Sequence, residues 1–117
     1  MDDEVLLVRL DAADMHVVWE LRTSTETVGY LQALDGDTLW ISHIGVDPRY
    51  RRQGHATRLL LAALAYAPDA PIALAAAPFP SWKEPGLAHE SLRAWYARHG
   101  FRPDPRPEDP YYMVLQR

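Results

Sequence analysis

The sequence contains no cysteine, a single lysine, and no run of apolar residues long enough to cross a bilayer. The absence of cysteine excludes disulfides, thiolate metal sites and a cysteine nucleophile. The five histidines share no metal-ligand spacing, and no serine lies in a glycine-flanked nucleophile motif, so we expect neither a metal site nor a hydrolase triad. The acidic start, Met1 to Glu4, is opposite in sign to a signal peptide, and we expect a cytoplasmic protein.

The composition indicates one globular domain over residues 1–117, because 48% of the residues are hydrophobic. The net charge of −4 predicts no general affinity for nucleic acid or for anionic membranes. Four of the eleven arginines nevertheless lie between Arg49 and Arg58, and a local basic segment of this kind suits a small polyanion. For Arg49 and Arg58 taken singly, a salt-bridging surface is the alternative.

The hydrophobic pattern changes halfway along the chain, from alternation typical of strands to the periodicity of helices. The first part predicts an antiparallel meander with strands over residues 5–10, 16–22, 27–34 and 39–46. The second part predicts a helix over 53–67 stopped by Pro68, and then a buried strand over 72–77 parallel to the fourth, for which a short apolar helix is the alternative. A helix over 88–99 ended by Gly100 and two short strands near 101 and over 111–116 follow. This order of elements predicts an α+β fold with one mixed sheet.

The junction between the fourth strand and the first helix carries the most informative motif. The strand ends at Val46 and Pro48, an arginine-rich turn follows, and the helix begins near Gly54. A strand, a tight turn and a helix start direct several backbone N–H groups and the positive end of the helix dipole at one point, which is an arrangement that binds phosphate. Gly54 and Ala56 keep side chains out of the way of such a ligand. An ordinary strand–helix connection is the alternative.

Two motifs identify a family resemblance. The spacing Arg51-x-x-Gly54-x-Ala56 resembles the pyrophosphate-binding signature of the GNAT acetyltransferase superfamily. The spacing Tyr96-x-x-x-Gly100-Phe101 resembles the second hallmark of that family, and both occur in the family order, so that the resemblance covers residues 39–116. The chain departs from the family at His89 and Leu92, where asparagine and alanine are usual.

This resemblance implies the GNAT acyl-CoA N-acyltransferase fold, in which two central parallel strands splay apart and acetyl-CoA lies between them. The backbone of the fourth strand would then pair with the pantetheine arm. The amides of residues 51–56 would hold the diphosphate, with help from Thr57 and the side chain of Arg52. The implied cofactor-binding residues are Ile44, Gly45, Val46, Arg51, Arg52, Gln53, Gly54, His55, Ala56 and Thr57.

The resemblance also suggests catalytic residues. Tyr96 matches the family's general acid, which protonates the departing thiolate, although a half-buried aromatic ring packed beside Trp95 is the alternative. The base would be His43 or Glu20, each of which could equally be an ordinary surface residue, and water could take part. The oxyanion would meet the backbone N–H near Ile44 or Gly45.

Only residues 11–15 separate the first two strands, where GNAT enzymes commonly have one or two helices that wall the acceptor site. We therefore expect an acceptor side that is open, suited to a large substrate, or completed by a second subunit in a homodimer. The predicted function is an acetyl-CoA-dependent N-acetyltransferase acting on a primary amine of a small molecule or protein. The alternative is a non-catalytic module of the same fold that binds acyl-CoA or a protein partner.

Overall fold

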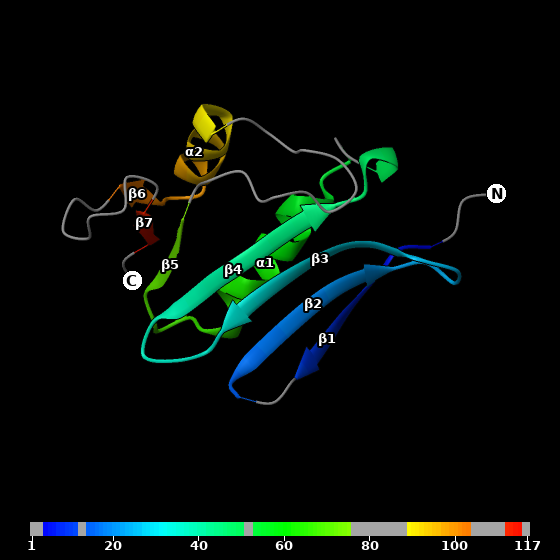
Figure 1. Ribbon diagram of the computed structural model, residues 1–117, viewed down its shortest axis with the longest axis horizontal. Coiled ribbons are helices and arrows are strands. Elements are labelled where there is room, and N and C mark those ends of the chain that lie inside the picture. The colour runs from blue at the N-terminus through cyan, green and yellow to red at the C-terminus, as the bar shows by residue number, and fades with distance from the viewer. Residues whose placement is uncertain (1–3, 12–13, 51–52, 76–88, 104–111, 116–117) are drawn as a thin grey trace.

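The computed structural model describes residues 4–11, 14–50, 53–75, 89–103 and 112–115. Over these residues, seven strands form one mixed sheet in the order β1-β2-β3-β4-β5-β7-β6 (Figure 1). The strands are β1 (Leu6–Asp11), β2 (His16–Arg22), β3 (Thr27–Leu34), β4 (Leu39–Val46), β5 (Ile72–Ala75), β6 (Arg102–Pro103) and β7 (Tyr112–Leu115). β1 to β4 form the predicted antiparallel meander, and β4 pairs with β5 in parallel. The α+β prediction is confirmed.

The described helices are η1 (Pro48–Tyr50), α1 (His55–Tyr66) and α2 (His89–Arg98). α1 begins later than the predicted residue 53 because Gly54 takes a left-handed conformation, with φ 80°, that a continuing helix does not allow. It ends just ahead of Pro68, as predicted. No helix in the described ranges has the length and apolar character that a membrane crossing requires.

α1 packs on one face of the sheet, behind β3 and β4 in Figure 1. The helix buries Leu59, Leu60 and Ala63, and the alternation predicted for β2 places Val17, Trp19 and Leu21 in the same core. The C-terminal end of α1 is anchored separately. Tyr66 Oη donates a 2.7 Å hydrogen bond to Asp35 Oδ2, and its ring meets Trp19 edge-on at 5.4 Å. The direction of α1 is therefore fixed at the end far from the proposed phosphate turn.

α2 ends on the same side of the sheet as α1. A Cβ at Gly100, just past α2, would lie 3.1 Å from Leu115 Cδ1. Leu115 pairs with Ile72, which pairs with Leu39, and paired residues point to one face. The opposite face of β1 to β3 is turned toward the viewer in Figure 1, with no described helix in front of it.

Candidate functional site

β4 and β5 separate partway along their length. Their parallel ladder joins Leu39 to Ile72, Trp40 to Ala73 and Ile41 to Leu74. Ala75, the last described residue of β5, is not part of it, and Figure 1 shows the two strands diverging. Past this point Ile44 and Gly45 pair with Leu31 and Tyr30 of β3 but with no described residue of β5. This is the splay of central strands that the family resemblance implied.

A β-bulge marks the place where the strands part. Gln32 of β3 is opposite His43, whereas the next residue, Ala33, is opposite Ile41, so Ser42 is an extra residue in β4. A bulge bends its strand and increases the local twist, which explains why β4 leaves β5 at this position. The bulge also reverses the alternation, so that His43 points away from α1. The signal was present in the sequence: Leu39, Ile41, Ile44 and Val46 break period two between 41 and 44.

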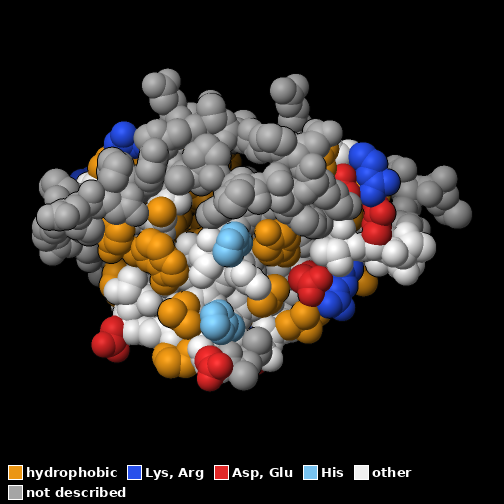
Figure 2. All heavy atoms as spheres, in the orientation of Figure 1, with side chains coloured by type: hydrophobic (Ala, Val, Ile, Leu, Met, Phe, Trp, Pro, Cys, Tyr) orange, Lys and Arg blue, Asp and Glu red, His pale blue; other side chains and the backbone are white. Residues whose placement is uncertain are grey.

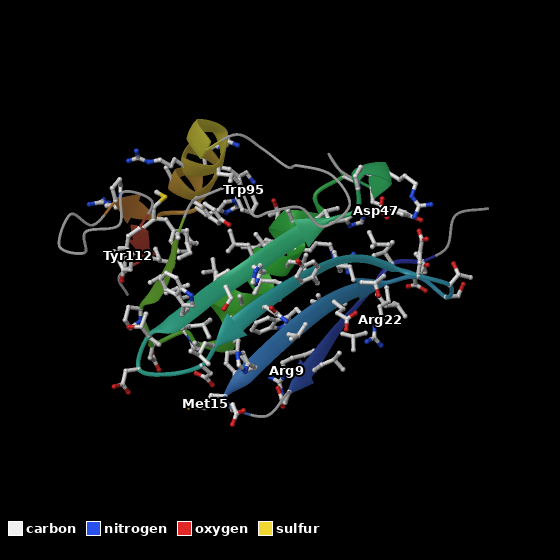
Figure 3. All side chains as sticks on the ribbon, viewed as in Figure 1. Arg9, Met15, Arg22, Asp47, Trp95 and Tyr112 are labelled. Carbon is white, nitrogen blue, oxygen red and sulfur yellow. The ribbon has the colours of Figure 1, made fainter. Side chains whose placement is uncertain are left out.

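Asp47, which the sequence analysis did not select, shapes the turn after β4. It is 1% exposed, its N–H donates to Val28 O at 2.7 Å, and its carbonyl accepts from Tyr50 N at 2.8 Å. Its carboxylate Oδ1 accepts from Arg49 N at 3.0 Å. Both the backbone and the side chain of Asp47 therefore hold η1, and with it the approach to α1 (Figure 3). The dipeptide Asp-Pro is a turn signal that could have identified this residue.

The first turn of α1 has the feature that anion binding requires. Arg58 N donates to Gly54 O at 3.0 Å, which is the first helical hydrogen bond. Among the described residues, none accepts a hydrogen bond from the N–H groups of His55, Ala56 or Thr57. These groups lie beyond the C-terminal end of β4, and they carry the positive end of the helix dipole. The described part of the chain therefore leaves this helix start uncapped.

The surroundings of this turn leave room for a ligand. A Cβ built on Gly54 would meet nothing within 4 Å, and Gln53 and Gly54 are exposed. His55, Ala56 and Thr57 are half-buried, while Arg51 and Arg52 lie outside the described residues. Open space in front of these amides, which donate to no described residue, suits the oxygens of a diphosphate, because these oxygens accept several hydrogen bonds at once.

The side chain of His55, the first residue of α1, has unusual surroundings for a histidine. Both of its ring nitrogens are buried, and neither has a hydrogen-bond partner among the described residues. The ring lies 6.4 Å from that of Tyr50 in η1. Burial, followed by the positive charge of Arg58, lowers the pKa of His55 below its usual value. The neutral imidazole therefore adds no charge of its own to the turn at neutral pH.

Arg49, one of the four arginines of the basic segment, is engaged by carboxylates of this chain and not held ready for a polyanion. Arg49 Nη2 donates to both carboxylate oxygens of Glu26 at 2.8 Å and to Asp47 Oδ2 at 3.0 Å. These carboxylates raise the pKa of the Arg49 guanidinium, and the alternative of a salt-bridging surface residue is confirmed for Arg49. Arg58 donates to Val5 O at 3.4 Å, which ties α1 to the start of β1.

Gly29 of β3, also missed in the sequence analysis, lets α1 approach the sheet at the site. A Cβ at this position would lie 3.0 Å from Gly45 O, 3.3 Å from Val46 Cγ2 and 3.4 Å from Leu59 Cδ1. Any side chain would have to displace the backbone of β4 or the first turns of α1. Gly29 therefore sets the distance between the amides of α1 and the strand implied for pantetheine.

The motif Tyr96-x-x-x-Gly100-Phe101 has a structural explanation in the end of α2. Phe101 N donates to Tyr96 O at 3.2 Å, and Gly100 N donates to Ala97 O at 3.0 Å, with φ of Gly100 at 95°. This is a Schellman motif, and the rings of Tyr96 and Phe101 make its usual apolar contact at 5.7 Å. The predicted cap at Gly100 is confirmed. The spacing of the motif thus follows from helix termination, and any catalytic role rests on the tyrosine hydroxyl alone.

Tyr96 is more deeply buried than the half-buried ring considered from the sequence. It is 1% exposed and meets Trp95 edge-on at 5.0 Å, and Trp95 lies on the side of α2 toward β4 in Figure 3. Burial raises the pKa of Tyr96 well above its usual value. The hydroxyl therefore stays protonated and is a weaker acid than a tyrosine in water, so hydrogen-bond donation is the role that this environment favours.

The two candidate bases differ in their surroundings. Glu20 Oε1 accepts from Arg22 Nη2 at 2.8 Å, and its Oε2 accepts from Thr27 Oγ1 at 3.2 Å. Both of its oxygens are thus engaged, which counts against Glu20 as a proton acceptor. His43 is exposed on the face away from α1, next in sequence to Ile44, where the strands part. The sheet register places His43 at the point where β4 leaves β5, whereas Glu20 lies on β2, two strands away from β4.

The sequence matches the family described as acetyltransferase (GNAT) domain over residues 13–103. None of the curated proteins with which it was compared matches it. An IAA acetyltransferase from Bacillus cereus is similar in structure, with a TM-score of 0.71, 13% identity, and coverage of 97% of this chain and 100% of that protein.

Two further structures contain ligands. The PaiA N-acetyltransferase from Thermoplasma acidophilum in complex with coenzyme A has a TM-score of 0.66 and 11% identity, with coverage of 87% of this chain but only 61% of that protein. Naa50 of Arabidopsis thaliana in complex with the bisubstrate analogue CoA-Ac-MVNAL has a TM-score of 0.66 and 18% identity, with coverage of 86% of this chain and 72% of that protein. These likenesses establish the shared fold. Together with the family match, the splayed strands identify this chain as a member of the GNAT acetyltransferase domain family.

Proposed function

We propose that this chain is an N-acetyltransferase that moves the acetyl group of acetyl-CoA to a primary amine of a small molecule or protein. The observation that carries the proposal is the start of α1, whose first amides donate to no described residue and which lies past the point where β4 leaves β5. A helix start of this kind binds the diphosphate, and a strand edge can pair with the amides of pantetheine.

The proposed binding residues have separate tasks. The N–H groups of residues 53–56, with Arg51, Arg52 and Thr57, hold the diphosphate. The backbone of Ile44 to Val46 pairs with the pantetheine arm and brings the thioester toward the bulge. Acetyl-CoA supplies the activated acetyl group when it is bound. The Thermoplasma protein binds coenzyme A in its crystal structure, and Naa50 binds an analogue that joins coenzyme A to an acetylated peptide, which supports both parts of the proposal.

The proposed chemistry gives two side chains different tasks, proton acceptance by His43 and hydrogen-bond donation by Tyr96. His43 accepts the proton of the amine, directly or through water, because its exposed imidazole lies on β4 beside the point where the strands part. Tyr96 donates a hydrogen bond that stabilises the departing thiolate. The backbone N–H near Ile44 or Gly45 faces the carbonyl oxygen as negative charge develops there.

The first test is calorimetry with coenzyme A and with pantetheine, which lacks the diphosphate. We expect coenzyme A to bind and pantetheine to bind far more weakly, since the α1 amides contribute only to the former. Thiol release from acetyl-CoA is then measured against a panel of amines and peptides. The absence of binding heat with coenzyme A would contradict the proposed cofactor site. Binding of coenzyme A without turnover on any acceptor would favour the alternative, a non-catalytic module that binds acyl-CoA.

A further inference from the structure

The exposed large apolar side chains are concentrated at one border of the sheet. Five of the six exposed large apolar side chains of the described residues lie on β1, in the turn after it, or at the end of β3 beside that turn. They are Leu6 (54% exposed), Leu7 (40%), Leu10 (38%), Met15 (61%) and Leu34 (40%), and the sixth is Leu61 on α1. Apolar side chains that gather in this way mark interaction surfaces more often than single exposed leucines do.

β1 is also an open edge. Among the described strands it pairs with β2 alone, so the backbone groups of its other side face outward. Natural edge strands are commonly protected by lysine, proline or a bulge, and Leu6–Asp11 contains none of these. Its two charged residues pair with each other, Arg9 Nε lying 3.6 Å from Asp11 Oδ1, and the guanidinium of Arg9 lies over the Tyr66 ring at 5.4 Å. Since Tyr66 belongs to α1, both charges point to the α1 face.

The other face of β1 is apolar and continues into the sheet. Leu6, Val8 and Leu10 share this face, and Leu10 pairs with Val18 of β2. Leu34 lies on the same face next to the β1–β2 turn, since Asp35 N donates to Met15 O at 2.8 Å. Figure 2 shows this face with hydrophobic side chains at the surface, and Figure 3 shows Met15 at its border.

We propose that a second copy of this chain pairs with β1 in antiparallel fashion, so that the two sheets become one. A two-fold axis perpendicular to the sheet generates such a pair, and it brings identical surfaces together. With Val8 on the axis, Leu6 lies opposite Leu10 of the second copy, and the apolar residues of both edges meet on the face away from α1. With Arg9 on the axis, two guanidinium groups would face each other, which disfavours that register.

This pairing has a consequence for the acetyl-transfer site. A two-fold axis perpendicular to the sheet keeps both α1 helices on one side and both uncovered faces on the other. The two His43 side chains then open onto one continuous surface, which offers a large acceptor a wider platform than a single copy does.

The absence of cysteine makes the register directly testable in the full chain. A Val8→Cys variant places its new thiol on the axis, within disulfide distance of its mate, and we expect a covalent dimer on mild oxidation. Leu10→Cys is the matched control on the same strand, because its Cα lies about 14 Å from its own mate in this register. A mixture of Leu6→Cys and Leu10→Cys should give a crosslinked heterodimer.

Sedimentation equilibrium of the unmodified chain supplies the independent measurement. We expect twice the monomer mass at micromolar concentrations and above, and a Leu6→Arg variant should need at least tenfold more protein to associate. At dilutions where both chains are monomers, the variant should unfold at the same temperature as the unmodified chain. A monomer at every concentration overturns the proposal, as does equal crosslinking of the Val8→Cys and Leu10→Cys variants. Coenzyme A binding by the monomeric Leu6→Arg variant is measured in parallel, so that failure of the interface is distinguished from failure of the cofactor site.

Discussion

Replacing Gly54 is the sharpest test of the proposed diphosphate site. A negative charge at this position should stabilise the folded chain slightly but weaken its affinity for coenzyme A. Gly54 has φ 80°, and any other common residue would pay about 1–2 kcal/mol to adopt that conformation. A Cβ there meets nothing within 4 Å, so no steric clash is added. Gly54→Gln and Gly54→Glu therefore carry the same strain and nearly the same shape, and they differ only in charge.

The carboxylate of Gly54→Glu lies at the start of α1, where a negative charge stabilises the helix dipole by about 0.3–1 kcal/mol. We therefore expect Gly54→Glu to unfold at the same temperature as Gly54→Gln or slightly above it. Against a phosphate about 4 Å away, the same carboxylate costs about 1–4 kcal/mol per pair of unit charges. Because 1.4 kcal/mol corresponds to a factor of ten, coenzyme A should bind Gly54→Glu at least about fivefold more weakly than Gly54→Gln.

The assay is isothermal titration with coenzyme A at low ionic strength, with thermal unfolding of each variant alongside. Added salt should narrow the difference in affinity between the two variants, since the repulsion is screened. Equal dissociation constants for Gly54→Glu and Gly54→Gln would refute the placement of the diphosphate at α1. A large loss of stability in Gly54→Glu alone would refute the reasoning about the helix start.

Three further predictions concern single side chains. Tyr96→Phe keeps the ring contact with Phe101, so we expect the stability and the affinity for coenzyme A to stay unchanged while kcat falls. Equal turnover by the two proteins would remove the hydroxyl from the mechanism. Asp47→Ala should lower the free energy of unfolding by about 1–2 kcal/mol, measured by urea denaturation, because the part-buried N–H of Arg49 loses its carboxylate acceptor. The pKa of His55 is lowered in the folded chain, so unfolded molecules bind its proton first as pH falls below about 6.5. Stability should then drop with pH in the window below that value, and His55→Gln should show a shallower drop in the same denaturation series.

Local patterns predicted most of the secondary structure because the residues concerned decide their own conformations. Strict alternation in residues 16–22 and the apolar stripe of Leu59, Leu60 and Ala63 each select one periodicity and one buried face. Gly100 ends α2 because left-handed backbone is accessible to glycine at little cost. The start of β1 moved by one residue because no such residue marks it, whereas the start of α1 moved because the left-handed Gly54 keeps residue 53 out of the helix.

The candidate site was predictable only in part. The helix start after β4 was readable from Gly54 and its neighbours, since amide direction follows from local backbone geometry. The sequence did not predict the ion pair of Arg49 with Glu26 or the close approach of Gly29 to β4 and α1, because each joins residues that are far apart in the chain. The preference for His43 over Glu20 likewise comes from cross-strand register and from the partners of Glu20, neither of which appears in a linear pattern.

The sequence by itself determined the succession of strands and helices, the two GNAT motifs and the glycine at which α1 begins, because turn chemistry and hydrophobic period act over a few residues. The tertiary structure alone decided where β4 leaves β5, how deeply Tyr96 is buried and which face of the sheet stays open. Those features depend on one extra residue at Ser42 and on packing between distant segments. A bulge changes the direction of every residue after it, so its effect is visible only when the neighbouring strands are in place.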